Sequence, residues 1–128
     1  MDVFIKKGSQ ETPEIHLDPQ TGIFNISGKS LPEDVKEFYN PVIKWLEGYI
    51  EEPKPETLLK VKMDYFNTAS SKMILEVFEL IKTLHENGNK LTIEWYYQED
   101  DEDMQDAGQD YADIVEVPFQ LICYQPEN

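Results

Sequence analysis

Apolar and polar residues alternate in several short segments of the chain, which is the pattern of half-buried β-strands. The first two segments, Glu14–Asp18 and residues 23–27, are separated by the turn sequence Asp18-Pro19-Gln20-Thr21-Gly22 and predict a hairpin. In residues 57–65 the alternation predicts that Leu59, Val61, Met63 and Tyr65 point to one face. The remaining predicted strands are residues 91–97 and 119–124.

Three other segments place apolar residues at helical spacing. The first spans residues 35–50, and Ser30-Leu31-Pro32-Glu33 before it has the spacing of a capping box. Pro41 cannot donate to a continuous helix and disfavours helical geometry at Asn40, so we expect a kink there or a second helix capped by Asn40. The clearest helix spans residues 71–87, before Gly88, and a third is predicted around Met104, Ala107 and Tyr111.

Strands that alternate with helices predict an α/β fold with parallel crossovers. Strands buried on both faces would be apolar throughout, whereas these alternate, so one face of the sheet should remain in contact with water. We therefore predict a mixed sheet with an N-terminal hairpin and with helices packed mainly on one face. A length of 128 residues suits a single domain, residues 1–128.

Charge and cysteine content limit the classes of partner. A formal net charge of −15 should repel nucleic acid and anionic membrane surfaces; it either attracts basic partners or only keeps the protein soluble. Cys123 is the single cysteine, which fits a reducing compartment, and its apolar surroundings predict a buried, inert thiol. No signal peptide begins the chain and no apolar run approaches the roughly 20 residues that span a membrane, so we expect a cytoplasmic protein.

The chain lacks the common catalytic signatures, including the P-loop, the dinucleotide-binding glycine motif and the zinc-protease motif. His16 is predicted on the polar face of a strand and His85 late in a helix, where a structural role suffices. Eight carboxylates lie between Glu99 and Asp113 without the order of a calcium loop. They predict a solvated helix face or a docking surface for a basic partner, with a carboxylate-using hydrolase as the alternative. We expect no enzyme activity, metal or cofactor.

The segment from Asp64 to Lys72 joins a predicted strand to a predicted helix, and sites in open α/β sheets collect at such strand ends. Asn67, Thr68, Ser70 and Ser71 can each cap a helix, and capping alone is one interpretation. A phosphoryl group attached here is the other, because the amides and the dipole at a helix start favour an anion.

Four motifs, taken together, carry a resemblance. A strand that ends in aspartate, a hydroxyl-rich loop and an amphipathic helix resemble the STAS domains of anti-sigma factor antagonists, which are phosphorylated at the start of this helix. More specifically, the chain resembles the SiaC family of bacterial regulatory phosphoproteins over nearly its whole length. The motifs are Ser30-Leu31-Pro32-Glu33, Phe38-Tyr39-Asn40-Pro41-Val42-Ile43-Lys44-Trp45-Leu46, Asp64-Tyr65-Phe66-Asn67-Thr68-Ala69-Ser70-Ser71-Lys72 and Asp110-Tyr111-Ala112-Asp113.

The resemblance implies that Thr68 is the phosphorylated residue and that Asn67, Ser70, Ser71 and Lys72 contribute to partner binding. It also implies a protein kinase of the SiaB type, a PP2C-like phosphatase of the SiaA type and a diguanylate cyclase of the SiaD type. The unphosphorylated protein would bind and activate the cyclase and so act in biofilm regulation. An anti-sigma factor antagonist is the alternative, and modification of Ser70 or Ser71 stays open.

Overall fold

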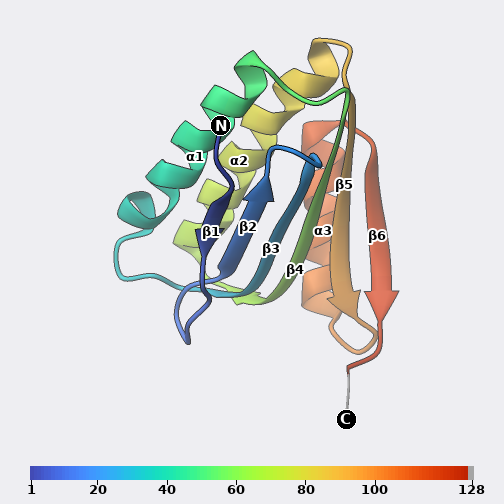
Figure 1. Cartoon of the computed structure of the whole chain (residues 1–128). Coiled ribbons are helices and arrows are strands. Elements are labelled where there is room, and N and C mark those ends of the chain that lie inside the picture. Colours follow the sequence, from blue (N-terminus) through green and yellow to red (C-terminus); the bar gives the residue numbers. More distant parts are fainter. Residues whose placement is uncertain (127–128) are drawn as a thin grey trace.

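The sheet has six strands among the described residues, and their spatial order follows the chain from β1 to β6 (Figure 1). The structure, a computed structural model, describes residues 1–126, so the last two residues of the predicted domain lie outside it. The elements are β1 (Phe4–Lys6), β2 (Glu14–Asp18), β3 (Ile23–Ser30), α1 (Val35–Glu51), β4 (Glu56–Phe66), α2 (Thr68–Glu86), β5 (Lys90–Gln98), α3 (Glu102–Val115) and β6 (Phe119–Tyr124).

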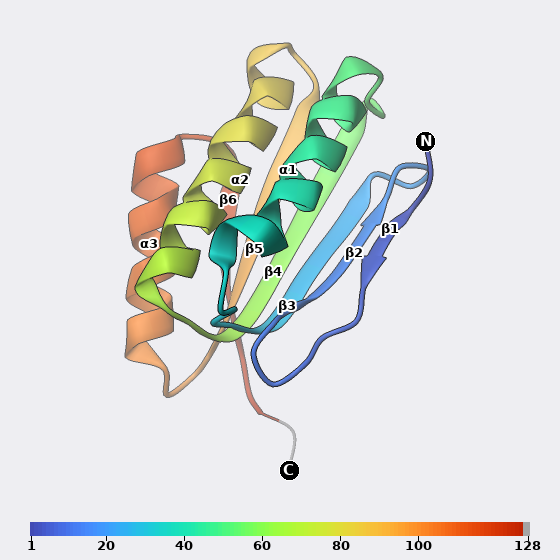
Figure 2. The same ribbon diagram turned by 90° about the vertical axis from the view of Figure 1, so that its left-hand side faces the viewer.

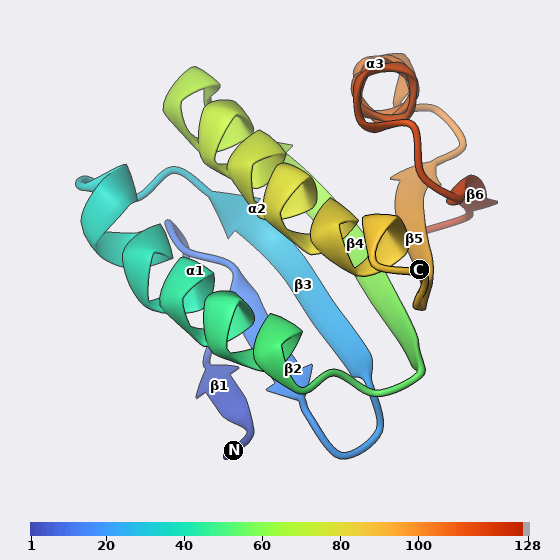
Figure 3. The ribbon, with the colours of Figure 1, turned by 90° about the horizontal axis from the view of Figure 1, so that it is seen from above.

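Strand directions divide the sheet into two parts. β1, β2 and β3 pair antiparallel, whereas β3, β4, β5 and β6 pair parallel. Each parallel connection contains one helix, and because successive right-handed crossovers advance in one direction, the helices fall on the same face. Figures 2 and 3 show α1, α2 and α3 on that face. The predicted mixed sheet with an N-terminal hairpin and one helix-covered face is confirmed.

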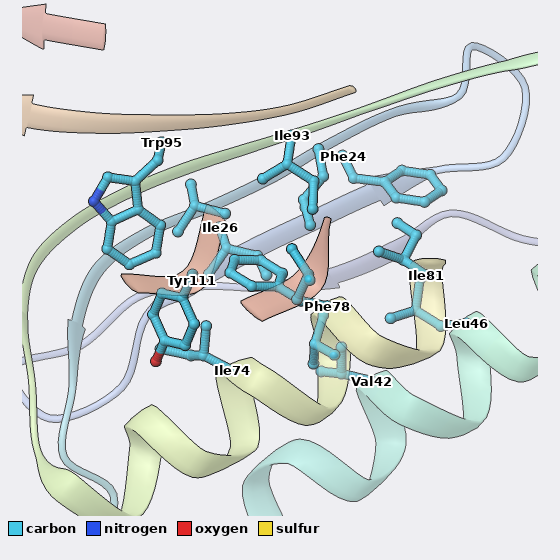
Figure 4. Close-up of a cluster of buried hydrophobic side chains, with 14 of the residues drawn as sticks. Phe24, Ile26, Val42, Leu46, Ile74, Phe78, Ile81, Ile93, Trp95 and Tyr111 are labelled. Carbon is cyan, nitrogen blue, oxygen red and sulfur yellow. The ribbon is translucent and has the colours of Figure 1, made fainter. Parts of the chain in front are cut away.

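The core lies between the sheet and the helices (Figure 4). Phe24 and Trp95 from the sheet pack against helix residues such as Leu46 and Phe78, and all four side chains are at most 2% exposed. On the opposite face of the sheet, which we call the open face, Lys62 Nζ lies 4.3 Å from the centre of the Tyr124 ring. The alternate side chains that face the helices therefore form the core, and the open face remains accessible to water.

The start of α1 differs from its prediction. Ser30 is the last residue of β3 and is fully buried, while Asp34 caps the helix through a 3.1 Å bond from the Glu37 amide to Asp34 Oδ1. α1 runs through Pro41 as one helix, so the predicted second helix does not form. Pro41 and Glu37 both face solvent, where water can satisfy the carbonyl that loses its helical donor.

The end of β4 also corrects its prediction. Gly28 pairs with Met63 but Lys29 pairs with Tyr65, so Asp64 is an extra residue, a β-bulge. The bulge reverses the alternation, which leaves Tyr65 51% exposed and turns Phe66 toward the core. Phe66 lies 6.0 Å from Trp95, between ring centres.

Two further differences concern the ends of the sheet. β1 has only three residues, too few to show a period, and was not predicted. Cys123 is exposed, contrary to the buried thiol predicted, because β6 is an edge strand with a neighbour on one side only. Elsewhere the predicted elements agree within a few residues, and Gly88, at φ 91°, follows the end of α2 as expected.

Candidate functional site

Thr68 is the first residue of α2, directly after the carboxyl end of β4. Asn67 precedes it as the N-cap, and its side-chain Oδ1 accepts a 2.8 Å hydrogen bond from the Ser70 amide. The Thr68 side chain is exposed. The helix therefore begins three residues earlier than predicted, and the hydroxyl of Thr68 lies at the surface where strand meets helix, as the sequence indicated.

Ser70 lies beneath this surface. Its side chain is fully buried, and its Oγ accepts a 2.8 Å hydrogen bond from Ser30 Oγ. The third helical position points back toward the sheet, which explains the burial. Ser70 was predicted to bind partners, but the structure gives it a supporting position under Thr68 and no surface of its own.

Ser71 and Lys72 lie on the outer side of the first turns. Ser71 is half-buried; its Oγ donates to the Thr68 carbonyl at 2.7 Å, and its own carbonyl accepts a 2.7 Å bond from the Tyr111 phenol of α3. Lys72 is exposed and lies four residues after Thr68, on the same side of the helix. Thr68 and Lys72 are thus the accessible members of the predicted set, with Asn67 and Ser71 partly buried beside them.

Two buried phenols stabilise this region as hydrogen-bond donors. Burial raises the pKa of Tyr39. Burial also raises the pKa of Tyr111 well above the usual value near 10, and the nearby Tyr39 contributes less. Both phenols therefore keep their protons at neutral pH.

Two depressions share the lining residues Phe66 and Ala107, near the start of α2. One, of about 270 Å³, is bounded by Ser71 and Lys72 of α2 and by α3. The other, of about 290 Å³, lies between the end of β4 and the start of α3. We call the two together the α2–α3 surface; its lining residues are Asp64, Tyr65, Phe66, Ser71, Lys72, Leu75, Asp101, Asp103, Met104, Ala107, Asp110, Tyr111 and Ile114.

The lining of the α2–α3 surface combines apolar and acidic side chains. Tyr65 and Ile114 are 51% and 52% exposed, and Asp103 and Asp110 in the same lining are also exposed. A larger open depression of about 840 Å³ lies at the start of α1 but contains none of the predicted site residues. We consider the smaller pair the functional surface because the predicted site residues Ser71 and Lys72 line it.

The other candidate residues do not assemble into a reactive site. Within residues 1–126, no group of three or more His, Cys, Asp or Glu side chains could hold a metal ion. His85 is exposed and His16 is half-buried in β2. Of the eight carboxylates between Glu99 and Asp113, seven are exposed, and the eighth, Asp101, caps α3 by accepting from the Met104 amide. This segment is a solvated helix face, without the buried acid that a hydrolase would need.

None of the helices in the described part of the chain is both long and apolar enough to cross a membrane.

Comparison with known proteins identifies the family. A model described as SiaC family regulatory phosphoprotein matches residues 6–124. The chain belongs to the SiaC family. A curated relative, an uncharacterized protein of Pseudomonas aeruginosa strain UCBPP-PA14, is 27% identical over 114 residues, which is 89% of this chain and 90% of that protein.

Solved structures of SiaC share the fold of this family member. SiaC of Pseudomonas aeruginosa superimposes with a TM-score of 0.89 at 25% identity, over 97% of this chain and 100% of the other. A second match is a chain in the crystal structure of the diguanylate cyclase SiaD in complex with its activator SiaC, from the same organism. Its TM-score is 0.89 at 26% identity, over 94% of this chain and 99% of that one. The family predicted from the four motifs is confirmed.

Three supporting residues of this SiaC-family protein escaped sequence reasoning. Ser30, Tyr39 and Tyr111 all lie within motifs that carry the resemblance, yet their spacing indicated a helix cap and helical stripes. Ser30 contacts Ser70, and Tyr111 contacts Ser71, across 40 residues of sequence in each case. For the two tyrosines, the signal that could have found them is a hydroxyl at a position predicted to be buried; Ser30, predicted as a helix cap, gave no such signal.

Proposed function

We propose that this protein is a phosphorylation-controlled, non-catalytic binding switch, that Thr68 is the switch residue, and that the unphosphorylated form binds and activates a diguanylate cyclase. The observation that carries the proposal is the exposed Thr68 at the capped start of α2, the helix whose Ser71 and Lys72 line the α2–α3 surface. Family membership supports a regulatory phosphoprotein.

A phosphoryl group on Thr68 suits the start of α2. The first amides of a helix have no carbonyl partner within the helix, and Asn67 satisfies only that of Ser70. The positive end of the helix dipole lies at the same place. Phosphorylation would add about two negative charges without requiring the fold to change.

The added charge would control docking through desolvation. A partner that covers Thr68 and the adjoining α2–α3 surface must remove the dianion from water, which costs several kcal/mol unless the dianion is paired. A difference of about 1.4 kcal/mol already changes affinity tenfold. Phosphorylation can therefore block the partner without a rearrangement of the sheet or helices.

The cyclase is proposed as the partner because a solved relative, SiaC of Pseudomonas aeruginosa, is described as the activator of the diguanylate cyclase SiaD. A SiaB-type kinase and a SiaA-type phosphatase would add and remove the phosphate, in the cytoplasm where ATP is supplied. An anti-sigma factor antagonist would use the same geometry, and the partner named for the relative favours the cyclase.

The test compares two substitutions at Thr68 by calorimetric titration against the SiaD-type cyclase of the same organism. Thr68→Ala should bind within about twofold of the parent, and Thr68→Glu at least about tenfold more weakly. Thr21→Glu, which adds the same charge at an exposed threonine in the β2–β3 turn, is the control and should leave affinity unchanged. Equal affinity of Thr68→Glu and the parent would contradict charge blockade.

Mass spectrometry of protein purified from its host addresses the modification itself. The expected result is a phosphate on the peptide that contains Thr68, removed by a PP2C-like phosphatase. A phosphate found only on other residues would show that the switch residue is wrong.

A further inference from the structure

We infer that Tyr39, Ser30 and Ser70 are positioning residues, which hold the start of α2 so that the hydroxyl of Thr68 is presented on an ordered backbone. This inference rests on the proposed function, because it explains how the switch residue is displayed. None of the three touches the surface: each is 0% exposed.

The three hydroxyls form one directed chain. Tyr39 Oη lies 2.6 Å from Ser30 Oγ, and Ser30 Oγ donates to Ser70 Oγ at 2.8 Å. A serine hydroxyl has a single proton, and that of Ser30 is committed to Ser70. Tyr39 must therefore donate to Ser30, so the chain runs from α1 through the end of β3 to the first turn of α2.

Ser30 makes hydrogen bonds to residues on both sides of Thr68. Its carbonyl accepts a 3.1 Å bond from the Asn67 amide, and its Oγ donates to Ser70. The Asn67 side chain closes the arrangement through the Ser70 amide at 2.8 Å. Thr68 thus lies between two residues that are attached to the same serine of a neighbouring strand.

The consequence is an exposed reactive hydroxyl with little backbone freedom. A kinase that phosphorylates Thr68, or a partner that covers it, does not need to order this segment first, an ordering that ordinarily costs free energy for each residue fixed. Loss of the hydrogen bonds among these three hydroxyls should therefore make the backbone of residues 67–70 more mobile while the sheet remains intact.

The protein supplies a matched control. Tyr49, at the other end of α1, makes an equally buried phenol–hydroxyl contact of 2.8 Å with Thr57 Oγ1. Tyr49→Phe removes the same kind of hydrogen bond as Tyr39→Phe from the same helix, together with the 3.1 Å bond that Tyr49 Oη accepts from the Lys54 amide. Its partner Thr57 lies at the start of β4, whereas Thr68 follows the end of that strand. Any effect common to both variants is general destabilisation.

The decisive experiment is native-state hydrogen exchange followed by NMR. Tyr39→Phe should accelerate exchange at the Asn67 and Ser70 amides by about fivefold or more beyond any change at the core amides of β5, and Tyr49→Phe should not. Ser70→Ala breaks the chain at its other end, so the Asn67 amide provides a second test if Tyr39→Phe folds poorly. Equal exchange at Asn67 and Ser70 in the two tyrosine variants overturns the inference.

Phosphorylation kinetics distinguish a failure of the positioning role from a failure of the proposed function. For phosphorylation by the SiaB-type kinase of the same organism, Tyr39→Phe should lower kcat about fivefold or more with KM unchanged, and Tyr49→Phe should leave both unchanged. If Tyr39→Phe changes neither exchange nor kcat, positioning fails. If exchange changes but Thr68→Glu still binds the cyclase like the parent, the proposed function fails and the positioning geometry stands.

Discussion

The phenol of Tyr111 donates a 2.7 Å hydrogen bond to the main-chain carbonyl of Ser71, which ties α3 to the first turn of α2. Both residues line the α2–α3 surface, and Ser71 is three residues after Thr68. The hydrogen bond adds to the packing of the Tyr111 ring against Phe78 of α2, 5.2 Å between ring centres, and it can be tested by removing a single oxygen.

Tyr111→Phe should lower the free energy of unfolding by about 1 kcal/mol, the usual net value of one buried hydrogen bond. Denaturation in urea measures the change. Tyr65→Phe is the control: its side chain is 51% exposed, so the loss of its hydroxyl should change stability by less than about 0.5 kcal/mol. Equal stability of Tyr111→Phe and the parent would show that the contact contributes no net free energy.

Alkaline pH should destabilise the protein through the same residue. Burial raises the pKa of Tyr111 in the folded state, whereas in the unfolded chain the phenol titrates near pH 10. Above about pH 10 the unfolded state therefore binds fewer protons than the folded state, so stability is full below that pH and falls as pH rises. Unfolding free energies from pH 8 to 11 should fall less steeply in Tyr111→Phe than in the parent; parallel curves would refute the assignment.

Gly108 is required by the approach of α3 to the sheet. A Cβ at this position would overlap Trp95 Cδ1 and lie 2.7 Å from Leu121 Cδ2. Gly108→Ala should therefore destabilise by about 1–3 kcal/mol, although alanine favours helices. Gly48→Ala in α1 is the control, because its Cβ would meet only the flexible end of Met1, and it should be neutral or stabilising by up to about 1 kcal/mol. Thermal unfolding distinguishes the two.

Ile114 should contribute to partner binding. It is 52% exposed and lines the α2–α3 surface, so Ile114→Ala should weaken cyclase binding by about tenfold with little change in stability. Ile5 in β1 is 55% exposed and lies at the opposite edge of the sheet, which makes Ile5→Ala a matched control with unchanged affinity. Calorimetric titration checks both; if the two variants bind alike, the partner uses another surface.

The sequence by itself determined the local features of this protein. Among the described residues, period-two and helical spacing located five of the six strands and all three helices. The candidate switch, Thr68, came from the family resemblance and stays a prediction. The predictions of strands and helices succeed because their signals are confined to a few neighbouring residues, where the backbone alone sets which side chains share a face. The cap-forming residues before α2 are such a local signal, although α2 begins at Thr68, three residues before the predicted start.

Only the tertiary structure decided what surrounds that switch. Ser30 has the spacing of a helix cap, but pairing of β3 with β4 places it beneath α2, 40 residues from Ser70. Because of the bulge at Asp64, Phe66 faces the core in place of Tyr65, which is exposed. Cys123 is exposed in the edge strand β6. Strand register and edge position depend on contacts between distant segments, and a side chain's burial depends on what packs over it, so no pattern within one segment contains that information.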